Sequence, residues 1–184
     1  MHIPACETRQ LEILTFQQAM EHRDQSAEYD RSRWLYIPDF YSEYRYILGT
    51  VGKCPLITIG INPSTAAPDA LDNTLKSVQR IALGNGFDSF IMFNVYAQRA
   101  TNPDQMDREF NEPLHRENMN AFRWVLERSG EHCLADMMEL GRQFDAVWYQ
   151  AGKPSVKGHP HHPLYLKKDS ALDPFDVAAY QASL

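Results

Sequence analysis

Polar side chains follow two apolar runs of the sequence, at the point where each run ends. The run PLITIGI (residues 55–61) is followed by Asn62, Pro63, Ser64 and Thr65, and the run SFIMF is followed by Asn94, Arg99 and Thr101. An asparagine side chain donates and accepts hydrogen bonds, and a proline after it stiffens the turn that presents it. Free N–H groups at such a turn can hold an anion, and a guanidinium suits a carboxylate or phosphate. The two stretches predict a site for a polar ligand, with well-made turns and ordinary helix caps as the alternative.

A third polar stretch, GHPHHPLYL (residues 158–166), places three histidines within four residues. A metal site is not expected, because Pro160 and Pro163 hold the chain extended and no acidic or cysteine partner has ligand spacing. His159 is instead a candidate for hydrogen bonding to a ligand or for proton transfer. His162 is a candidate substrate contact. For all three histidines, a solvated loop is the alternative.

The elements between these stretches predict how they meet. Both apolar runs are typical of buried parallel strands. Between them, Leu71, Leu75, Val78 and Ala82 recur at helical spacing, and Asp72 lies where it could cap the helix or face a ligand. Strand, helix and strand form a βαβ unit over residues 55–96. Because the carboxyl ends of parallel strands meet at one edge of a sheet, the polar residues after the two strands should converge.

Further elements flank this unit. Residues 33–38 and 44–49 predict a hairpin at a sheet edge, because Pro38 cannot occupy a central ladder position. Helices are expected within residues 8–25, 116–129, 133–144 and 175–181, and a short strand within residues 145–150. An α/β domain with a mostly parallel sheet accounts best for this order.

The bulk composition indicates one cytoplasmic domain. The 184 residues carry a formal net charge of -6, which is unlike the basic face of proteins that bind duplex DNA. Three widely spaced cysteines argue against disulfides or a thiolate zinc site. No apolar run is long enough to span a bilayer. Walker, dinucleotide-binding, Gly-x-Ser-x-Gly and His-Glu-x-x-His motifs are absent, and no cofactor is expected.

Four long stretches resemble a known family. YRYIL, ITIGINPSTAAPDALDNTLKSVQRIA, FNVYAQRATNP and GHPHHPLYL match, in order, the family catalogued as domain of unknown function 1643. The resemblance covers roughly residues 44–176. It implies a single domain over residues 1–184, with a core over residues 34–176 and a helical extension over residues 1–33. The family name implies no activity.

A more distant resemblance implies chemistry. Gly60-Ile61-Asn62-Pro63 is similar to the first motif of the uracil-DNA glycosylase-like superfamily, MFNVYAQR to its asparagine-bearing strand end, and His159-Pro160 to the start of its last motif. The resemblance implies a three-layer α/β sandwich with a short, mostly parallel sheet. Asn62 would orient the hydrolytic water, and His159 would steady the charge on the departing base. Residues 122–134 leave too little room for a strand usual in the family, and the sequence leaves open whether one core strand is missing.

These observations lead to three hypotheses. The first is a hydrolase of an N-glycosidic bond in a nucleotide or nucleic acid, with Asn94 and Arg99 holding the base or its phosphate. Pro63, Ser64, Thr65, Asp72, Thr101 and His162 would complete the substrate site. The second is a non-catalytic module that binds a nucleotide, a nucleobase or a single-stranded nucleic acid end. The third is a degenerate, inactive homologue. The sequence leaves the substrate and the oligomeric state open.

Overall fold

The computed structural model of the chain describes residues 1–129, 147–156, 160, 166–167 and 170–182. Its strands are β1 (Trp34–Ile37), β2 (Ile47–Thr50), β3 (Pro55–Gly60), β4 (Ser89–Asn94), β5 (Tyr149–Ala151) and β6 (Leu172–Pro174). Its helices are η1 (Thr8–Gln10), α1 (Phe16–Glu21), α2 (Asn73–Gly84), η2 (Pro103–Gln105), α3 (Glu112–Ser129) and α5 (Val177–Ala182). None of the described helices is long and apolar enough to cross a membrane.

The main sheet is mixed, with strand order β1-β2-β4-β3. β3 and β4 pair in parallel, from Pro55 opposite Ser89 to Gly60 opposite Asn94. The β1–β2 and β2–β4 pairs are antiparallel. The predicted hairpin is therefore confirmed, with β1 at the sheet edge. The prediction of a mostly parallel sheet is wrong for the described strands, because β2 pairs directly with β4 and continues the sheet in the opposite direction.

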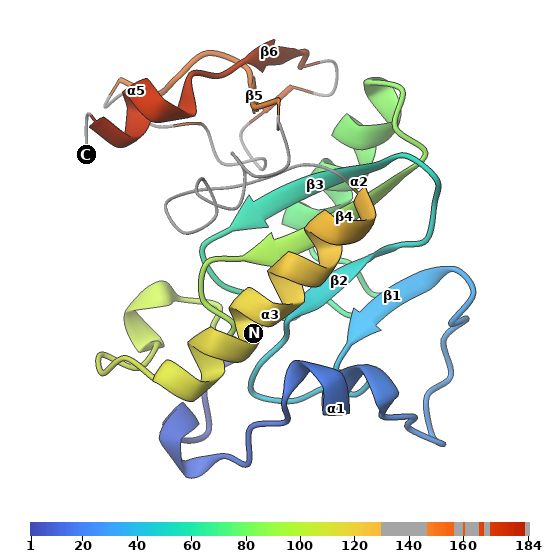
Figure 1. The fold of residues 1–184 in the computed structure, drawn as a ribbon, viewed down its shortest axis with the longest axis vertical. Helices are drawn as coiled ribbons and strands as arrows, with labels where there is room; N and C mark the ends of the chain where they lie inside the picture. The colour runs from blue at the N-terminus through green and yellow to red at the C-terminus, as the bar shows by residue number, and fades with distance from the viewer. Residues whose placement is uncertain (130–146, 157–159, 161–165, 168–169, 183–184) are drawn as a thin grey trace.

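Helices cover both faces of this sheet (Figure 1). On one face, α2 packs Leu75, Val78 and Ala82 against Phe90 and Met92 of β4. On the other face, α1 and α3 pack against the alternate residues of the strands; the buried side chains include Phe16, Ala19, Ile91, Phe93, Leu114, Ala121 and Phe122. The described core is thus an α/β domain, as expected, with helices on both faces of a mixed four-stranded sheet, and the finer glycosylase-like sandwich stays a prediction. All six residues of β4 are buried, as predicted, whereas β3 is half-buried along its whole length.

The predicted βαβ unit is confirmed over β3, α2 and β4. Asp72 caps α2, since its Oδ1 accepts a hydrogen bond from the backbone N–H of Leu75 at 2.9 Å. After the helix ends, Gly86 adopts a φ of 84°, which a glycine reaches without steric cost. The tight turn returns the chain to the sheet as β4.

The predicted helix over residues 8–25 is wrong in its length. Helical structure is limited to η1 and the six residues of α1, where Thr15 and Gln18 form a capping box. The backbone of Leu14 is instead held by two tyrosines just before β2, because its N–H donates to Tyr44 Oη at 3.0 Å and its C=O accepts from Tyr46 Oη at 2.7 Å. These tertiary hydrogen bonds outweigh the local helical pattern.

The C-terminal part agrees with the sequence in outline. α3 contains the predicted helix 116–129 and begins four residues earlier, and α5 lies within the predicted 175–181 helix apart from its last residue. β5 overlaps the end of the predicted strand and pairs antiparallel with β6. The predicted helix 133–144 and the end of the 122–134 stretch, where a family strand was in question, fall within residues 130–146, outside the described residues.

Close packing between β2 and β4 makes Gly49 the most restrictive position of the sheet. A Cβ atom there would lie 2.9 Å from Ile91 Cα and closer still to the Phe90 carbonyl oxygen. Since the neighbouring backbone cannot move without breaking the ladder, we expect Gly49→Ala to lower the free energy of unfolding by about 2–3 kcal/mol. Gly84→Ala is the control, because nothing lies within 4 Å of its added Cβ. Equal stabilities of the two variants in urea denaturation would contradict this packing.

A buried carboxylate fastens the N-terminal residues to the end of β1. Asp39, 5 % exposed, accepts hydrogen bonds from His22 Nδ1 at 2.6 Å, Arg31 at 2.9 Å and the Asp24 N–H at 3.0 Å. Burial raises the pKa of Asp39, but these hydrogen bonds outweigh it and leave the pKa below its ordinary value. The stabilisation is therefore present above the unfolded pKa of about 4 and is lost as the pH falls through the lower folded pKa.

We expect Asp39→Asn to cost about 1–2 kcal/mol of unfolding free energy at neutral pH, a range that allows for the partial exposure of His22 and Arg31. The difference from the unsubstituted protein should shrink as the pH is lowered below about 4. Denaturation curves at a series of pH values measure it. A difference that stays constant down to acid pH would show that the charge of Asp39 contributes nothing.

Candidate functional site

The chain segments that leave β3 and β4 stay paired beyond the strands. Val95 N–H donates to the Gly60 carbonyl, Tyr96 N–H to the Ile61 carbonyl and Ala100 N–H to the Pro63 carbonyl, each at 2.9 Å. These bonds continue the parallel register into the two loops. The loop that carries Asn62 and the segment that carries Arg99 therefore lie side by side, as the sequence predicted.

Asn62 bridges these two segments with its side chain. Its Nδ2 donates to the Ala100 carbonyl at 2.8 Å and to the Pro63 carbonyl at 3.0 Å. Two carbonyl oxygens can only accept, so they fix which end of the amide is the NH2 group. The Oδ1 atom is held on the opposite side and accepts no hydrogen bond from the described part of the chain. Asn62 is half-buried, and its oxygen is oriented by the fold before any ligand binds.

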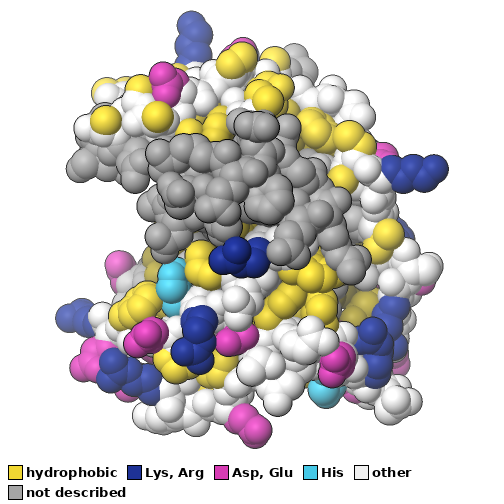
Figure 2. Space-filling view, viewed as in Figure 1, with side chains coloured by type: hydrophobic (Ala, Val, Ile, Leu, Met, Phe, Trp, Pro, Cys, Tyr) yellow, Lys and Arg dark blue, Asp and Glu magenta, His cyan; other side chains and the backbone are white. Residues whose placement is uncertain are grey.

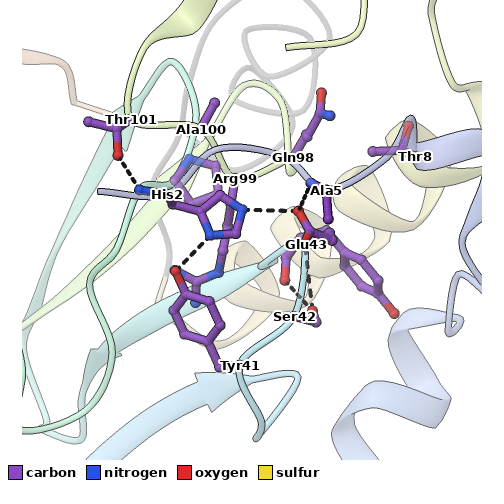
Figure 3. A network of polar contacts seen from close by, with 12 residues as sticks. His2, Ala5, Thr8, Tyr41, Ser42, Glu43, Gln98, Arg99, Ala100 and Thr101 are labelled. Carbon is purple, nitrogen blue, oxygen red and sulfur yellow. Dashed lines mark hydrogen bonds and ion pairs between the residues drawn. The ribbon is translucent and has the colours of Figure 1, made fainter. Parts of the chain in front are cut away.

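The hydroxyls of Ser64 and Thr101 also join the two loops, with 3.1 Å between Oγ and Oγ1. Thr101 also pairs with the N-terminal segment: its Oγ1 accepts from the His2 N–H at 2.7 Å, and its own N–H donates to the His2 carbonyl at 2.9 Å (Figure 3). Sequence reasoning missed this contact, since nothing local to His2 signals a partner 99 residues away. Thr65 lies half-buried in the same loop.

Asn94 ends β4 as a fully enclosed side chain. It is 0 % exposed, and neither its Nδ2 nor its Oδ1 has a hydrogen-bond partner among the described residues. Its position in the strand alternation puts it on the α2 face, after Met92. A Cβ atom on Gly60 would lie 2.9 Å from Asn94 Oδ1, so the glycine of the Gly-Ile-Asn-Pro stretch leaves room for this amide. A buried amide without partners costs about 1–3 kcal/mol, which distinguishes Asn94 from an ordinary core residue.

Arg99 is directed into the protein. It is 0 % exposed and donates to the Ser64 carbonyl, to the Ala66 carbonyl at 3.1 Å and to Tyr36 Oη at 2.9 Å. Burial raises the pKa of Tyr36 despite the nearby arginines, so its hydroxyl is neutral. The predicted free guanidinium fork is instead engaged with the loop after β3, which it holds in shape.

A second arginine, Arg45, shares this position and was missed by the sequence reasoning. It is 1 % exposed, and its Nη1 donates to the Ala66 carbonyl at 3.0 Å. The available signal was a charged residue inside the otherwise aromatic and apolar YRYIL. Asp72, whose carboxylate caps α2, contributes a weaker electrostatic attraction to Arg45.

The predicted histidine partners fall outside the described residues. His159 and His162 belong to ranges 157–159 and 161–165, so the convergence of His159 with Asn62 stays a prediction. Within the described residues, no group of three or more His, Cys, Asp or Glu side chains could hold a metal ion. Figure 2 shows basic and acidic side chains interspersed on the face in view, with no single basic stripe among those described.

The bridging role of Asn62 can be tested through stability. Because Asn62→Ala removes two hydrogen bonds between the loops, we expect it to lower the free energy of unfolding by about 1–2 kcal/mol. Asn73→Ala, at an exposed position at the start of α2, is the matched control and should change stability by less than about 0.5 kcal/mol. Calorimetric or urea unfolding measures both. Indistinguishable variants would mean that the Asn62 amide does not join the loops.

Comparison with known proteins assigns the chain to a family. The model of the family described as "Protein of unknown function (DUF1643)" matches residues 45–164, about two thirds of the chain. The match begins at Arg45 and includes Asn62, Asn94, Arg99 and His159. No match was found among curated proteins or among solved structures. The chain therefore belongs to the DUF1643 family of proteins of unknown function.

Proposed function

We propose that this protein binds a nucleobase-bearing ligand at the carboxyl ends of β3 and β4 and hydrolyses its N-glycosidic bond. The observation that carries the proposal is the carboxamide of Asn94, which is fully buried and whose donor and acceptor are not paired with any described residue. The ligand class includes nucleosides, nucleotides and single-stranded nucleic acid. The net charge of -6 and the mixed charges of the visible face favour these over duplex DNA (Figure 2).

The chemistry of Asn94 supports a planar heterocyclic ligand. A carboxamide presents one N–H donor direction and one C=O acceptor direction side by side. The edge of a nucleobase presents a ring nitrogen and an exocyclic oxygen or amine at the same spacing, so two hydrogen bonds can form at once. A ligand that makes both bonds removes the cost of the unpaired amide, and one that lacks either group leaves part of that cost in place. Selectivity for the base would follow directly.

The hydrogen bonds of Asn62 support a role for its side chain in positioning a water molecule. Its NH2 group is fixed by the Pro63 and Ala100 carbonyls, and its Oδ1 is left to accept from a water molecule. In the reaction, the water oxygen bonds to C1′ of the sugar, and the C1′–N bond breaks with its electron pair leaving on the base. A water proton is released as the new C1′–OH forms. An amide cannot take up that proton as a carboxylate can, so Asn62 would orient water and leave the proton to solvent. His159, as the resemblance implies, would stabilise the negative charge on the base.

The absence of a carboxylate at position 62 favours a second candidate function. A binding module needs the Asn94 amide and the surrounding loops, but no proton acceptor. Among the described residues, the one acidic candidate, Asp72, is engaged in capping α2. Binding without turnover, or the remnant activity of a degenerate homologue, would use the same residues. The two functions differ in whether free base is released.

Thermal unfolding with a panel of nucleosides, nucleotides and single-stranded oligonucleotides tests the proposal. A ligand at about one hundred times its Kd should stabilise the protein by about 2.7 kcal/mol. We expect Asn94→Ala to weaken that binding by about ten- to a hundredfold, because both hydrogen bonds to the base are lost. Gln10→Ala, an exposed carboxamide in η1, is the control and should bind normally.

Release of free base, followed by chromatography, then separates the two functions. Hydrolysis that disappears in His159→Ala while binding persists supports the hydrolase. Binding without release supports the module. If no base-bearing compound stabilises the protein, or if Asn94→Ala binds as well as the unsubstituted protein, the nucleobase site is refuted.

A further inference from the structure

Two arginine side chains lie together in the core, and neither forms an ion pair with a described residue, although Asp72 attracts Arg45 weakly. Arg45 and Arg99 are 1 % and 0 % exposed, and both donate to the same Ala66 carbonyl oxygen, at 3.0 and 3.1 Å. None of the ion pairs formed by the described residues includes either arginine. Two like charges that share one acceptor must lie within a few ångströms of each other. This arrangement is costly unless an opposite charge is close by.

The positive charge persists at neutral pH. Burial, followed by the charge of Arg99, lowers the pKa of Arg45 to about 9, which still leaves its guanidinium protonated. Carbonyl oxygens of Ser64 and Ala66 and the hydroxyl of Tyr36 carry only partial charges. They satisfy hydrogen bonds but do not neutralise two cations. The cluster retains a net charge that a bound anion would balance.

Both arginines also keep an unused donor. The Nε atoms of Arg45 and Arg99 are buried and have no hydrogen-bond partner in the described part of the chain. A guanidinium offers its donors in a planar fork that matches the oxygens of phosphate and carboxylate groups. Unused donors on both side chains distinguish this pair from arginines whose only role is to support a loop.

One face of the Arg99 guanidinium is covered by the side chain of Tyr41. The ring of Tyr41 stacks on the Arg99 guanidinium, with 4.2 Å between Cζ and the ring centroid, although the residue itself is 51 % exposed. Its hydroxyl lies 2.8 Å from His2 Nδ1, and His2 Nε2 lies 3.0 Å from Glu43 Oε2 (Figure 3). Rotation of Tyr41 would break its hydrogen bond to His2 and uncover that face of the guanidinium.

We propose that Arg45 and Arg99 form a binding site for a phosphate group, entered past Tyr41. The site is distinct from the Asn94 amide, and its existence does not depend on recognition of a base. If both sites serve one ligand, that ligand is a nucleotide or the phosphorylated end of a strand, and a nucleoside alone would bind more weakly. The phosphate source is therefore free inorganic phosphate or a phosphate ester, and the two are separated by experiment.

Calorimetric titration of the full chain with inorganic phosphate, at ionic strength held constant with chloride, tests the site. We expect saturable binding that Arg45→Met weakens at least about tenfold, since it removes one of the two charges while keeping a similar stem. Arg123→Met is the matched control, because it removes one charge from an exposed position on α3 and should bind phosphate normally. No saturable binding, or equal weakening in both variants, overturns the proposal.

Tyr41→Ala keeps the proposal testable if Arg45→Met does not fold. Loss of the ring uncovers Arg99, so phosphate affinity should change at least about threefold. An unchanged affinity would place the anion elsewhere and refute the site.

Parallel titrations with a nucleoside and its 5′-monophosphate complete the test. Tighter binding of the monophosphate than of either separate part supports one shared ligand. Phosphate binding without nucleoside binding refutes only the nucleobase site, whereas nucleoside binding without phosphate binding refutes only the site proposed here.

Discussion

The parallel pairing of β3 with β4 is the constraint on which the candidate site depends. Because the two strands run in the same direction, both exits lie at one edge of the sheet, and the hydrogen bonds from Val95, Tyr96 and Ala100 extend the pairing into the loops. The crossover through α2 supplies the return path, with Asp72 as its cap. Asn62, Ser64, Asn94 and Thr101 are brought together by topology alone, before any side-chain contact is considered.

Buried polar groups give this edge of the sheet its chemical character. Arg99 and Arg45 hold the Ser64–Ala66 backbone from within, and Asn62 joins Pro63 to Ala100. These contacts make a rigid frame, which is what a site needs if its donors and acceptors are to be oriented in advance. Within the described residues, the same frame leaves the Asn94 amide and two guanidinium Nε atoms without hydrogen-bond partners. In a low-dielectric interior such groups reduce stability, so a ligand that pairs with them would stabilise the fold as it binds.

Periodicity and topology rules predicted the central unit well. The apolar runs gave β3 and β4, helical spacing gave α2 and α3, and the carboxyl-end rule gave the convergence of Asn62 with the Arg99 segment. The features that these rules could not predict depend on contacts between residues far apart in the sequence. The segment before α1 has a helical pattern but is held extended by Tyr44 and Tyr46. β2 pairs antiparallel with β4, although the sequence of β2 does not indicate which strand it pairs with. Arg99 was predicted to be a free cation because residue type alone does not show whether a side chain is buried. The sequence around His2 likewise gave no local signal of its contact with Thr101.

The most direct test of the central claim is the NMR signal of the Asn94 side-chain NH2 group, assigned by its loss in an Asn94 variant and followed during titration with a nucleoside. The account predicts a large change of this resonance and slowed exchange of its protons with solvent, because an unpaired amide gains two hydrogen bonds. A ligand that saturates the protein while the Asn94 resonance stays unchanged would contradict it.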